Sequence, residues 1–199
     1  MSSAPSRFVP PPDEPVFRLS VEQYHSMINA GILSDDDPVE LLEGVLVFKL
    51  PKNPPHETAL GKCQDELPAA IPRGWIVRLQ APVTLGDSEP EPDVAIVRGT
   101  RDDYRERHPA PADIALLIEI ADTTLDRDRG IKLRAYARAG IAQYCIIDLV
   151  GRRAEFYREP QPEADDPQYA APVILQAQDE MSFDIGDGTV RIALSNLLP

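Results

Sequence analysis

The chain has 199 residues and a formal net charge of -13 at neutral pH, a length that suits one domain with a sizeable core and would cramp a second. No apolar run reaches the ~18 residues of a membrane-spanning helix, and the amino terminus lacks the order of a signal peptide, so we expect a soluble, cytoplasmic protein. The acidic charge argues against extensive non-specific binding to nucleic acid, although five basic residues between 127 and 138 accompany a single acid and could form a local basic surface.

The amino-terminal segment divides into an arm and the start of a domain. Prolines are frequent over residues 1–15 and prevent a helix or an internal strand, so we expect a flexible arm there and a single domain over 16–199. A capping box that begins at Ser20 and a stop at Gly31 predict a short amphipathic helix over 21–30.

The next part of the chain alternates strand and helix patterns. Residues 39–48 are rich in strand formers around a central Glu-Gly pair, which predicts two short strands or one bent strand. A helix over about 55–70 follows, and residues 75–79 and 83–85 predict further strands.

A βαβ unit is predicted in the second half of the chain. An apolar strand begins near Asp93, and a second runs over residues 114–120. Good helix formers over 125–139 end at Gly140, and residues 143–149 show another buried-strand pattern.

The carboxy-terminal part is predicted to be mainly strands. Residues 154–157 suit a hairpin partner at the edge of the sheet. The loop over 159–172, rich in prolines and acids, is expected to be mobile, and short strands are predicted near 173–175 and 190–194.

Two carboxylates occur where apolar strands penalise charge. Asp93, at the mouth of its strand, could simply cap backbone amides, whereas Glu119 lies within an apolar strand and needs a cation or hydrogen-bond donors. Magnesium accepts one or two carboxylates together with water and phosphate oxygens, and a lysine can stabilise the developing charge. With Lys132 on the following helix, the pattern suggests divalent-metal phosphodiester chemistry.

The basic helix could bring several groups to one cleft. By helical spacing, Arg129, Lys132 and Tyr136 share a face, although a solvated amphipathic face would show the same pattern. Arg129 could bind phosphate or pair with Asp126 or Asp128, and Tyr136 could contact substrate or pack on the sheet.

Longer motifs resemble the Uma family of restriction endonucleases, in the PD-(D/E)XK nuclease superfamily. The resemblance extends from about residue 19 to the carboxy terminus. It rests on Glu40-Leu41-Leu42-Glu43-Gly44 followed by His56, Pro92-Asp93-Val94-Ala95, Ile118-Glu119-Ile120, residues 128–141 and residues 143–148. Ala121 stands where the superfamily has a lysine two residues after the glutamate, so Lys132 would supply the ammonium from the helix.

This resemblance implies an α/β fold with a restriction-endonuclease-like central mixed β-sheet flanked by helices, and an endonuclease-like domain over 16–199. It also implies that Asp93, Glu119 and the carbonyl of Ile120 bind Mg²⁺ or Mn²⁺, that Glu40 is an accessory acid, and that DNA is the substrate.

Other functions stay open on the residues alone. A catalytically silent nuclease fold could act as a binding or dimeric interaction module, and a phosphoesterase for small nucleotides would tolerate the acidic surface better. A homodimer would let two small domains reach both strands of a duplex, but no residue in the sequence demonstrates one. His56 could support the site or cap its helix, and Glu43 is expected to serve the turn beside Gly44.

Overall fold

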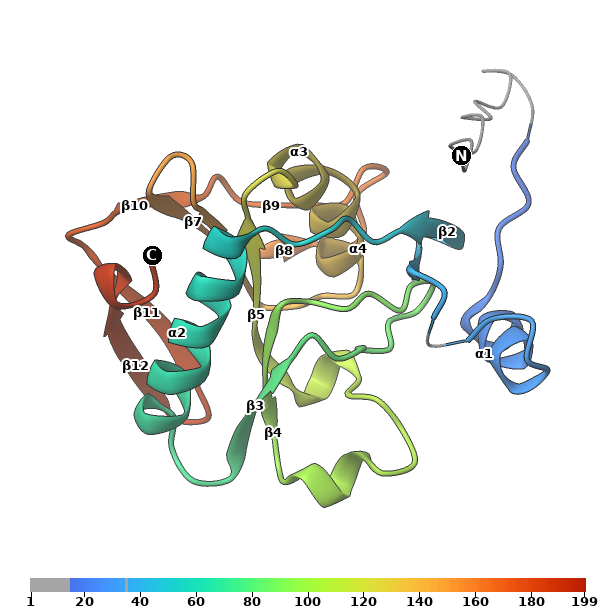
Figure 1. Cartoon of the computed structure of the whole chain (residues 1–199), viewed down its shortest axis with the longest axis horizontal. Coiled ribbons are helices and arrows are strands. Elements are labelled where there is room, and N and C mark those ends of the chain that lie inside the picture. The colour runs from blue at the N-terminus through green and yellow to red at the C-terminus, as the bar shows by residue number, and fades with distance from the viewer. Residues whose placement is uncertain (1–14, 35) are drawn as a thin grey trace.

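The computed structural model describes residues 15–34 and 36–199, so all but the last residue of the predicted arm over 1–15 lies outside it. Its centre is a six-stranded mixed sheet (Figure 1). In spatial order the strands are β10 (Val173–Gln176), β7 (Arg153–Arg158), β6 (Gln143–Asp148), β5 (Ile114–Ala121), β4 (Val94–Arg98) and β3 (Trp75–Leu79). Only β5 and β6 are parallel, and a helical crossover joins them, as a parallel pair requires. The predicted α/β class with a mixed central sheet is confirmed.

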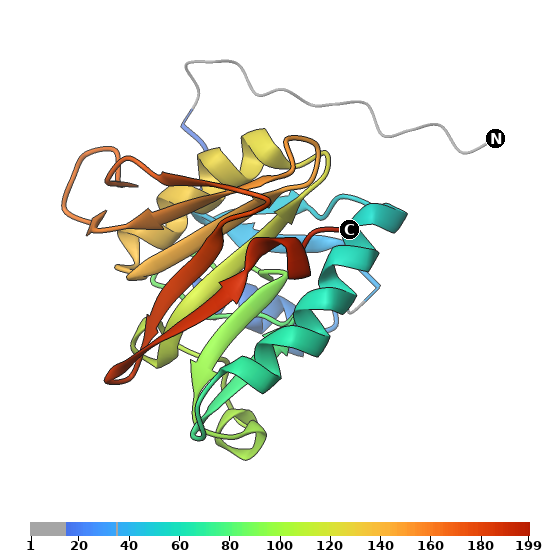
Figure 2. The same ribbon diagram turned by 90° about the vertical axis from the view of Figure 1, so that its left-hand side faces the viewer.

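One face of the sheet is covered by a long helix and a hairpin. Helix α2 (Pro54–Ala70) and the β11 (Glu180–Ile185) and β12 (Gly188–Ala193) pair lie over it on the side turned to the viewer in Figure 2. Alternate residues of β5 and β6, among them Ile118 and Cys145, pack with α2 and the hairpin in one apolar cluster.

The opposite face is covered by a broken helix. It consists of α3 (Leu125–Arg127), a π-helical turn over Asp128–Lys132 and α4 (Leu133–Arg138). Gly130 departs from helical geometry, with φ of -102° and ψ of -105°. Burial of Leu133, Ala135, Tyr136 and Ala137 against the sheet holds α4 in place, and the small ladder of β8 (Pro160–Gln161) with β9 (Gln168–Tyr169) lies beside it.

The amino-terminal elements extend the fold at one side. Helix α1 (Val21–Asn29) begins at a complete Ser20 capping box and packs on the hairpin of β1 (Val39–Leu42) and β2 (Val45–Phe48). At its turn, Glu43 and Gly44 both have positive φ, and a side chain on Gly44 would collide with Arg18.

Most predicted elements are present, and three expectations are wrong. Residues 83–85 form no strand, because isolated backbone bonds to Ser88 and Pro90 hold them in a loop. The helix over 125–139 is broken at Gly130, and β7 is not an edge strand, because β10 pairs with its outer side. Within the described residues, the model holds no helix long and apolar enough to cross a membrane.

Candidate active site

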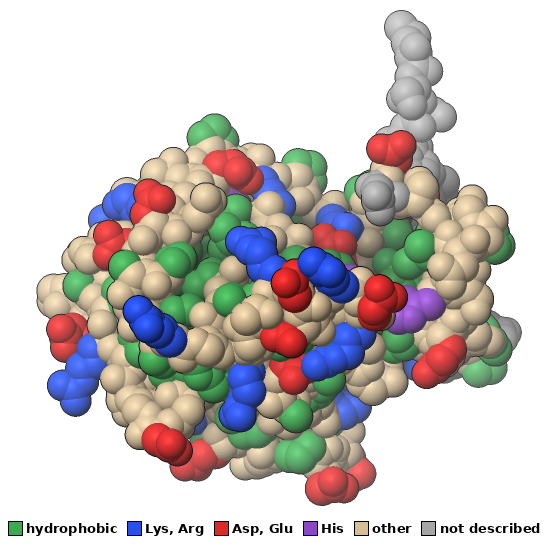
Figure 3. Space-filling view, turned by 90° about the horizontal axis from the view of Figure 1, so that it is seen from below, with side chains coloured by type: hydrophobic (Ala, Val, Ile, Leu, Met, Phe, Trp, Pro, Cys, Tyr) green, Lys and Arg blue, Asp and Glu red, His purple; other side chains and the backbone are tan. Residues whose placement is uncertain are grey.

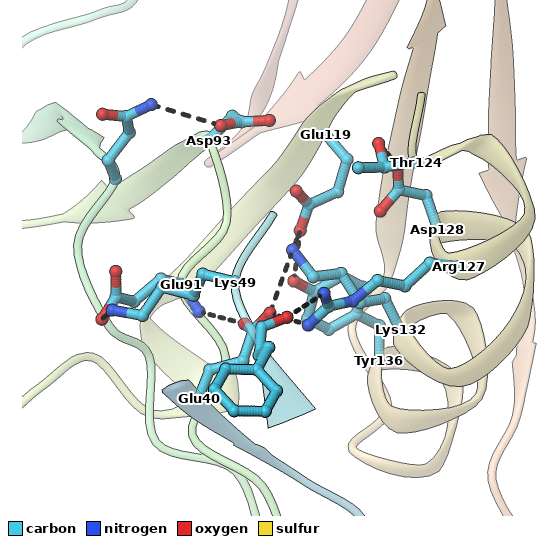
Figure 4. Close-up of polar contacts among 12 residues, drawn as sticks. Glu40, Lys49, Glu91, Asp93, Glu119, Thr124, Arg127, Asp128, Lys132 and Tyr136 are labelled. Carbon is cyan, nitrogen blue, oxygen red and sulfur yellow. Dashed lines mark hydrogen bonds and ion pairs between the residues drawn. The ribbon is translucent and has the colours of Figure 1, made fainter. Parts of the chain in front are cut away.

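A cavity of about 80 Å³ opens where β4 begins and β5 ends. The two ends meet because the strands are antiparallel, with Val94 paired to Ile118, so Asp93 and Glu119 reach the same place from different strands. The π-helical turn and the hairpin of β1 and β2 supply further side chains (Figure 4). The charged and titratable residues around its floor are Glu40, His56, Asp93, Glu119, Asp128 and Lys132.

Asp93 is held in one orientation by groups from three elements. Its Oδ2 accepts a hydrogen bond of 2.9 Å from the backbone N–H of Ile120 and lies 3.0 Å from Nε2 of His56 on α2. Its Oδ1 has only a long contact of 3.4 Å with Gln80. Burial raises the pKa of Asp93, but His56, the Ile120 amide and Lys132 outweigh it and leave that pKa below its ordinary value. Asp93 is therefore an ionised carboxylate at neutral pH.

Glu119 lies deeper and meets two groups of the broken helix. Only 2% of it is exposed, and its Oε1 accepts hydrogen bonds from Lys132 Nζ at 2.8 Å and from the Tyr136 hydroxyl at 2.7 Å. Burial raises the pKa of Glu119 despite the attraction of Lys132. Burial lowers the pKa of Lys132, yet Glu119, Glu40 and Asp128 together raise it above its usual value. The site thus holds a buried ammonium among carboxylates.

Glu40 joins the β1–β2 hairpin to the site. Its Oε2 accepts a hydrogen bond of 3.0 Å from the Glu91 amide, while its Oε1 pairs with Arg127 and lies 3.9 Å from Lys132 Nζ (Figure 4). Arg127 also donates to the Phe48 carbonyl at 2.6 Å. Glu40 therefore lies beside the ammonium, where the family resemblance places an accessory acid.

Two cavity residues, the buried Asp128 and the partly buried Arg127, were not among the predicted site residues. Asp128, 2% exposed, accepts a hydrogen bond from Thr124, and burial raises its pKa above the ordinary value even though Lys132 and Thr124 lower it. Arg127 belongs to the same basic stretch of sequence as Arg129, Arg134 and Arg138, but its side chain is less exposed than theirs. The only sequence signal for these two residues was that they lie within five positions of Lys132. The burial of Arg127 could not be predicted, because it depends on partners more than 70 residues away in sequence.

The basic residues between 127 and 138, which could have formed a local basic surface, are each paired with a carboxylate. The five pairs are Arg127 with Glu40, Arg129 with Glu155, Lys132 with Glu119, and both Arg134 and Arg138 with Glu43. Arg129 therefore does not share a cleft with Lys132 and Tyr136, since the break at Gly130 cancels the helical spacing that predicted this. Glu43 serves the turn, as expected, and also anchors it to α4.

The donor set suits a hard divalent ion, although side chains alone supply only part of it. No group of three His, Cys, Asp or Glu side chains within residues 15–34 and 36–199 is arranged to hold a metal ion. Two carboxylates with backbone and water oxygens are nevertheless a donor set that Mg²⁺ accepts. The N–H and C=O of one strand residue point to the same side, and the Ile120 N–H reaches Asp93, so the Ile120 carbonyl is directed toward Asp93 as well.

Comparisons with known proteins agree with the motifs and the fold. The family model Uma2, described as "Putative restriction endonuclease", matches residues 21–190. A crystal structure described as a "putative nuclease belonging to DUF820", from Anabaena variabilis ATCC 29413, superimposes with a TM-score of 0.60 and 16% sequence identity, over 90% of this chain and 97% of that chain. No curated protein matches the sequence. At this identity the superposition supports the fold alone.

Proposed function

This chain belongs to the Uma2 family, described as "Putative restriction endonuclease", and on that premise we propose that it is a metal-dependent endonuclease that hydrolyses DNA phosphodiester bonds. The observation that carries the proposal is the position of Glu119, buried beside the Lys132 ammonium and in the same cavity as Asp93. A structural core does not need two carboxylates and a lysine around one small cavity, because burying each charge is costly. Their convergence favours catalysis.

Asp93, Glu119 and the Ile120 carbonyl are the proposed ligands of Mg²⁺ or Mn²⁺. Protein donors occupy one oxygen of each carboxylate, from Ile120 at Asp93 and from Lys132 and Tyr136 at Glu119. Among the described residues, Glu119 Oε2 has no hydrogen-bond donor and is available to an ion. A bound ion would neutralise charge on the scissile phosphate and lower the pKa of a water molecule.

Lys132 is proposed to position the reacting groups. An ammonium has three N–H donors, and Glu119 uses one of them, so two are available for the attacking water or a phosphate oxygen. Glu40, 3.9 Å from the same Nζ, keeps the ammonium charged and fixes its direction. Tyr136 donates to the same oxygen of Glu119 as Lys132 does, so this carboxylate need not reorganise when a substrate arrives.

The test is cleavage of supercoiled plasmid and of labelled oligonucleotides with Mg²⁺ or Mn²⁺. We expect Asp93→Asn and Glu119→Gln each to abolish cleavage and to weaken Mn²⁺ binding in calorimetry, because each removes an anionic ligand at constant size. Glu180→Gln, which changes an exposed carboxylate on β11, is the matched control and should keep both properties. Cleavage that survives in either site variant, or an unmodified protein that neither cleaves DNA nor binds Mn²⁺, contradicts the proposal.

A further inference from the structure

One wall of the cavity is a stiff, exposed segment that connects β2 to α2. We call residues 48–55 the rim segment; Figure 1 shows it running from β2 across the end of β5 to α2. Three prolines within these eight residues restrict its backbone. It exposes large apolar side chains, with Phe48 64% and Leu50 46% accessible to solvent. Phe48 does not line the cavity but directly precedes Lys49 and Leu50, which do. A rigid segment that presents an exposed aromatic ring next to the lining residues forms a preorganised binding surface.

The rim segment is fastened across the opening of the cavity. Asn53 donates a hydrogen bond of 2.8 Å to Asp122, in the loop that follows β5, and Arg127 holds the Phe48 carbonyl. Behind these contacts Glu119 is only 2% exposed. A scissile phosphate must therefore enter a narrow opening, which a flexible single strand can do more easily than a stiff, two-stranded helix.

The charges near the site favour contact with only a few phosphates. Lys52, on the rim segment, is exposed and forms no ion pair with any described residue, whereas Lys49 pairs with Glu91 at 2.6 Å. Figure 3 shows the molecule from below, away from the rim segment, and there too basic and acidic side chains alternate with no continuous basic surface. Since duplex binding depends on neutralising many phosphates, a protein with a net charge of -13 needs another source of affinity.

We propose that the rim segment binds single-stranded nucleic acid, with an unpaired base stacked on Phe48 and a neighbouring phosphate at Lys52. This inference rests on the proposed function, because it names the form of substrate that reaches the same cavity. In a duplex the faces of the bases are already stacked, so an exposed aromatic ring discriminates in favour of unpaired bases. Stacking also supplies affinity that does not depend on the net charge of the protein.

The experiment measures fluorescence anisotropy of a labelled single-stranded oligonucleotide and of the matching duplex, in EDTA, with the full chain. We expect the single strand to bind more tightly, and Phe48→Ala to weaken its binding on the order of 5- to 150-fold, the range given by base–aromatic stacking. Lys52→Gln should make the negative slope of log K against log salt shallower by about 0.7, the contribution of one phosphate contact to a single strand. Ile174→Ala, which truncates an exposed apolar residue on the edge strand β10, is the matched control and should not change binding.

Binding in EDTA is independent of metal-dependent cleavage, so this test and the cleavage test can fail separately. Duplex binding that equals or exceeds single-strand binding overturns the inference, as does an effect of Phe48→Ala no larger than that of Ile174→Ala. Absence of binding to either oligonucleotide at low salt overturns it too. Thermal melting of each variant establishes that a loss of binding does not reflect unfolding.

Discussion

Replacing Tyr136 by phenylalanine isolates one hydrogen bond at the centre of the proposed site. Tyr136 is fully buried, its hydroxyl donates to Glu119 at 2.7 Å, and its ring packs edge-on against Tyr144 with centroids 4.9 Å apart. Tyr136→Phe keeps the ring and removes only the hydroxyl. A hydrogen bond to a charged group contributes about 1.5–3 kcal/mol. Burial raises the pKa of Glu119 to about 8, so we expect the free energy of unfolding to fall by that amount above this pH, where Glu119 is ionised. In a chain of this size the melting temperature should fall by roughly 3–12 °C.

Tyr144→Phe is a matched control for this prediction. Tyr144 is equally buried in the same aromatic cluster, but its hydroxyl donates to the Asp128 carbonyl at 3.0 Å, which is a neutral acceptor. A neutral hydrogen bond contributes about 0.5–1.5 kcal/mol, so the control should lose about 1 kcal/mol less. Urea denaturation of the three proteins, analysed with their m-values, measures both differences. The comparison is made above the raised pKa of Glu119, where its carboxylate is ionised. If Tyr136→Phe costs no more than Tyr144→Phe there, Glu119 is not a charged acceptor.

Three further predictions concern the groups around the site. Arg129 lowers the pKa of Glu155, so the stability that Glu155 contributes should be complete at neutral pH and decline as the pH falls below 4.5. The difference in melting temperature between the unmodified protein and Glu155→Gln should therefore disappear in acid. A difference that stays constant with pH would refute this. Glu43→Ala should cost about 1–2 kcal/mol and speed amide exchange in β1 and β2, because two arginines of α4 lose their acceptor; unchanged exchange would speak against the anchor. His56→Ala should weaken Mn²⁺ binding about tenfold in calorimetry, because the substitution frees the Asp93 side chain to turn. His25→Ala, which removes a histidine paired with Glu89, should not weaken it. Equal effects of the two substitutions would show that His56 has no special role in metal binding.

The central strands were predictable because burial on both faces leaves a continuous apolar run in the sequence. This is why the expected strands over 114–120 and 143–149 closely match β5 and β6, in which every residue is buried. Strand β11 was missed, since it alternates buried and exposed residues and includes two acids, which weakens its apolar pattern. The break at Gly130 was also missed, because a single glycine is tolerated in many helices and its backbone angles depend on what packs around it.

The proposed site was predictable only where a charge contradicts its local setting. Glu119 lies within an apolar strand, so the sequence itself indicates that something must compensate its charge. Asp128 and Arg127 lie in a polar, charged stretch where nothing marks them as buried. The partners of Arg127 are in place only after Glu40 and Phe48, far earlier in the chain, pack against the broken helix.

The ammonium beside Glu119 comes from Lys132 on the broken helix and not from the strand that bears Glu119, which affects how nucleases of this kind can be recognised. Ala121, two residues after Glu119, is fully buried in the apolar cluster that includes α4, so that place in the strand has no room for a lysine. Lys132 brings its Nζ to within 2.8 Å of Glu119 from a different element. A search for an acid and a lysine at fixed spacing in one strand overlooks this chain. A search of structures for a lysine ammonium in contact with a strand carboxylate, at any separation in sequence, would detect it. A survey that requires a fixed spacing between the acid and the lysine undercounts proteins in which a different element supplies the lysine.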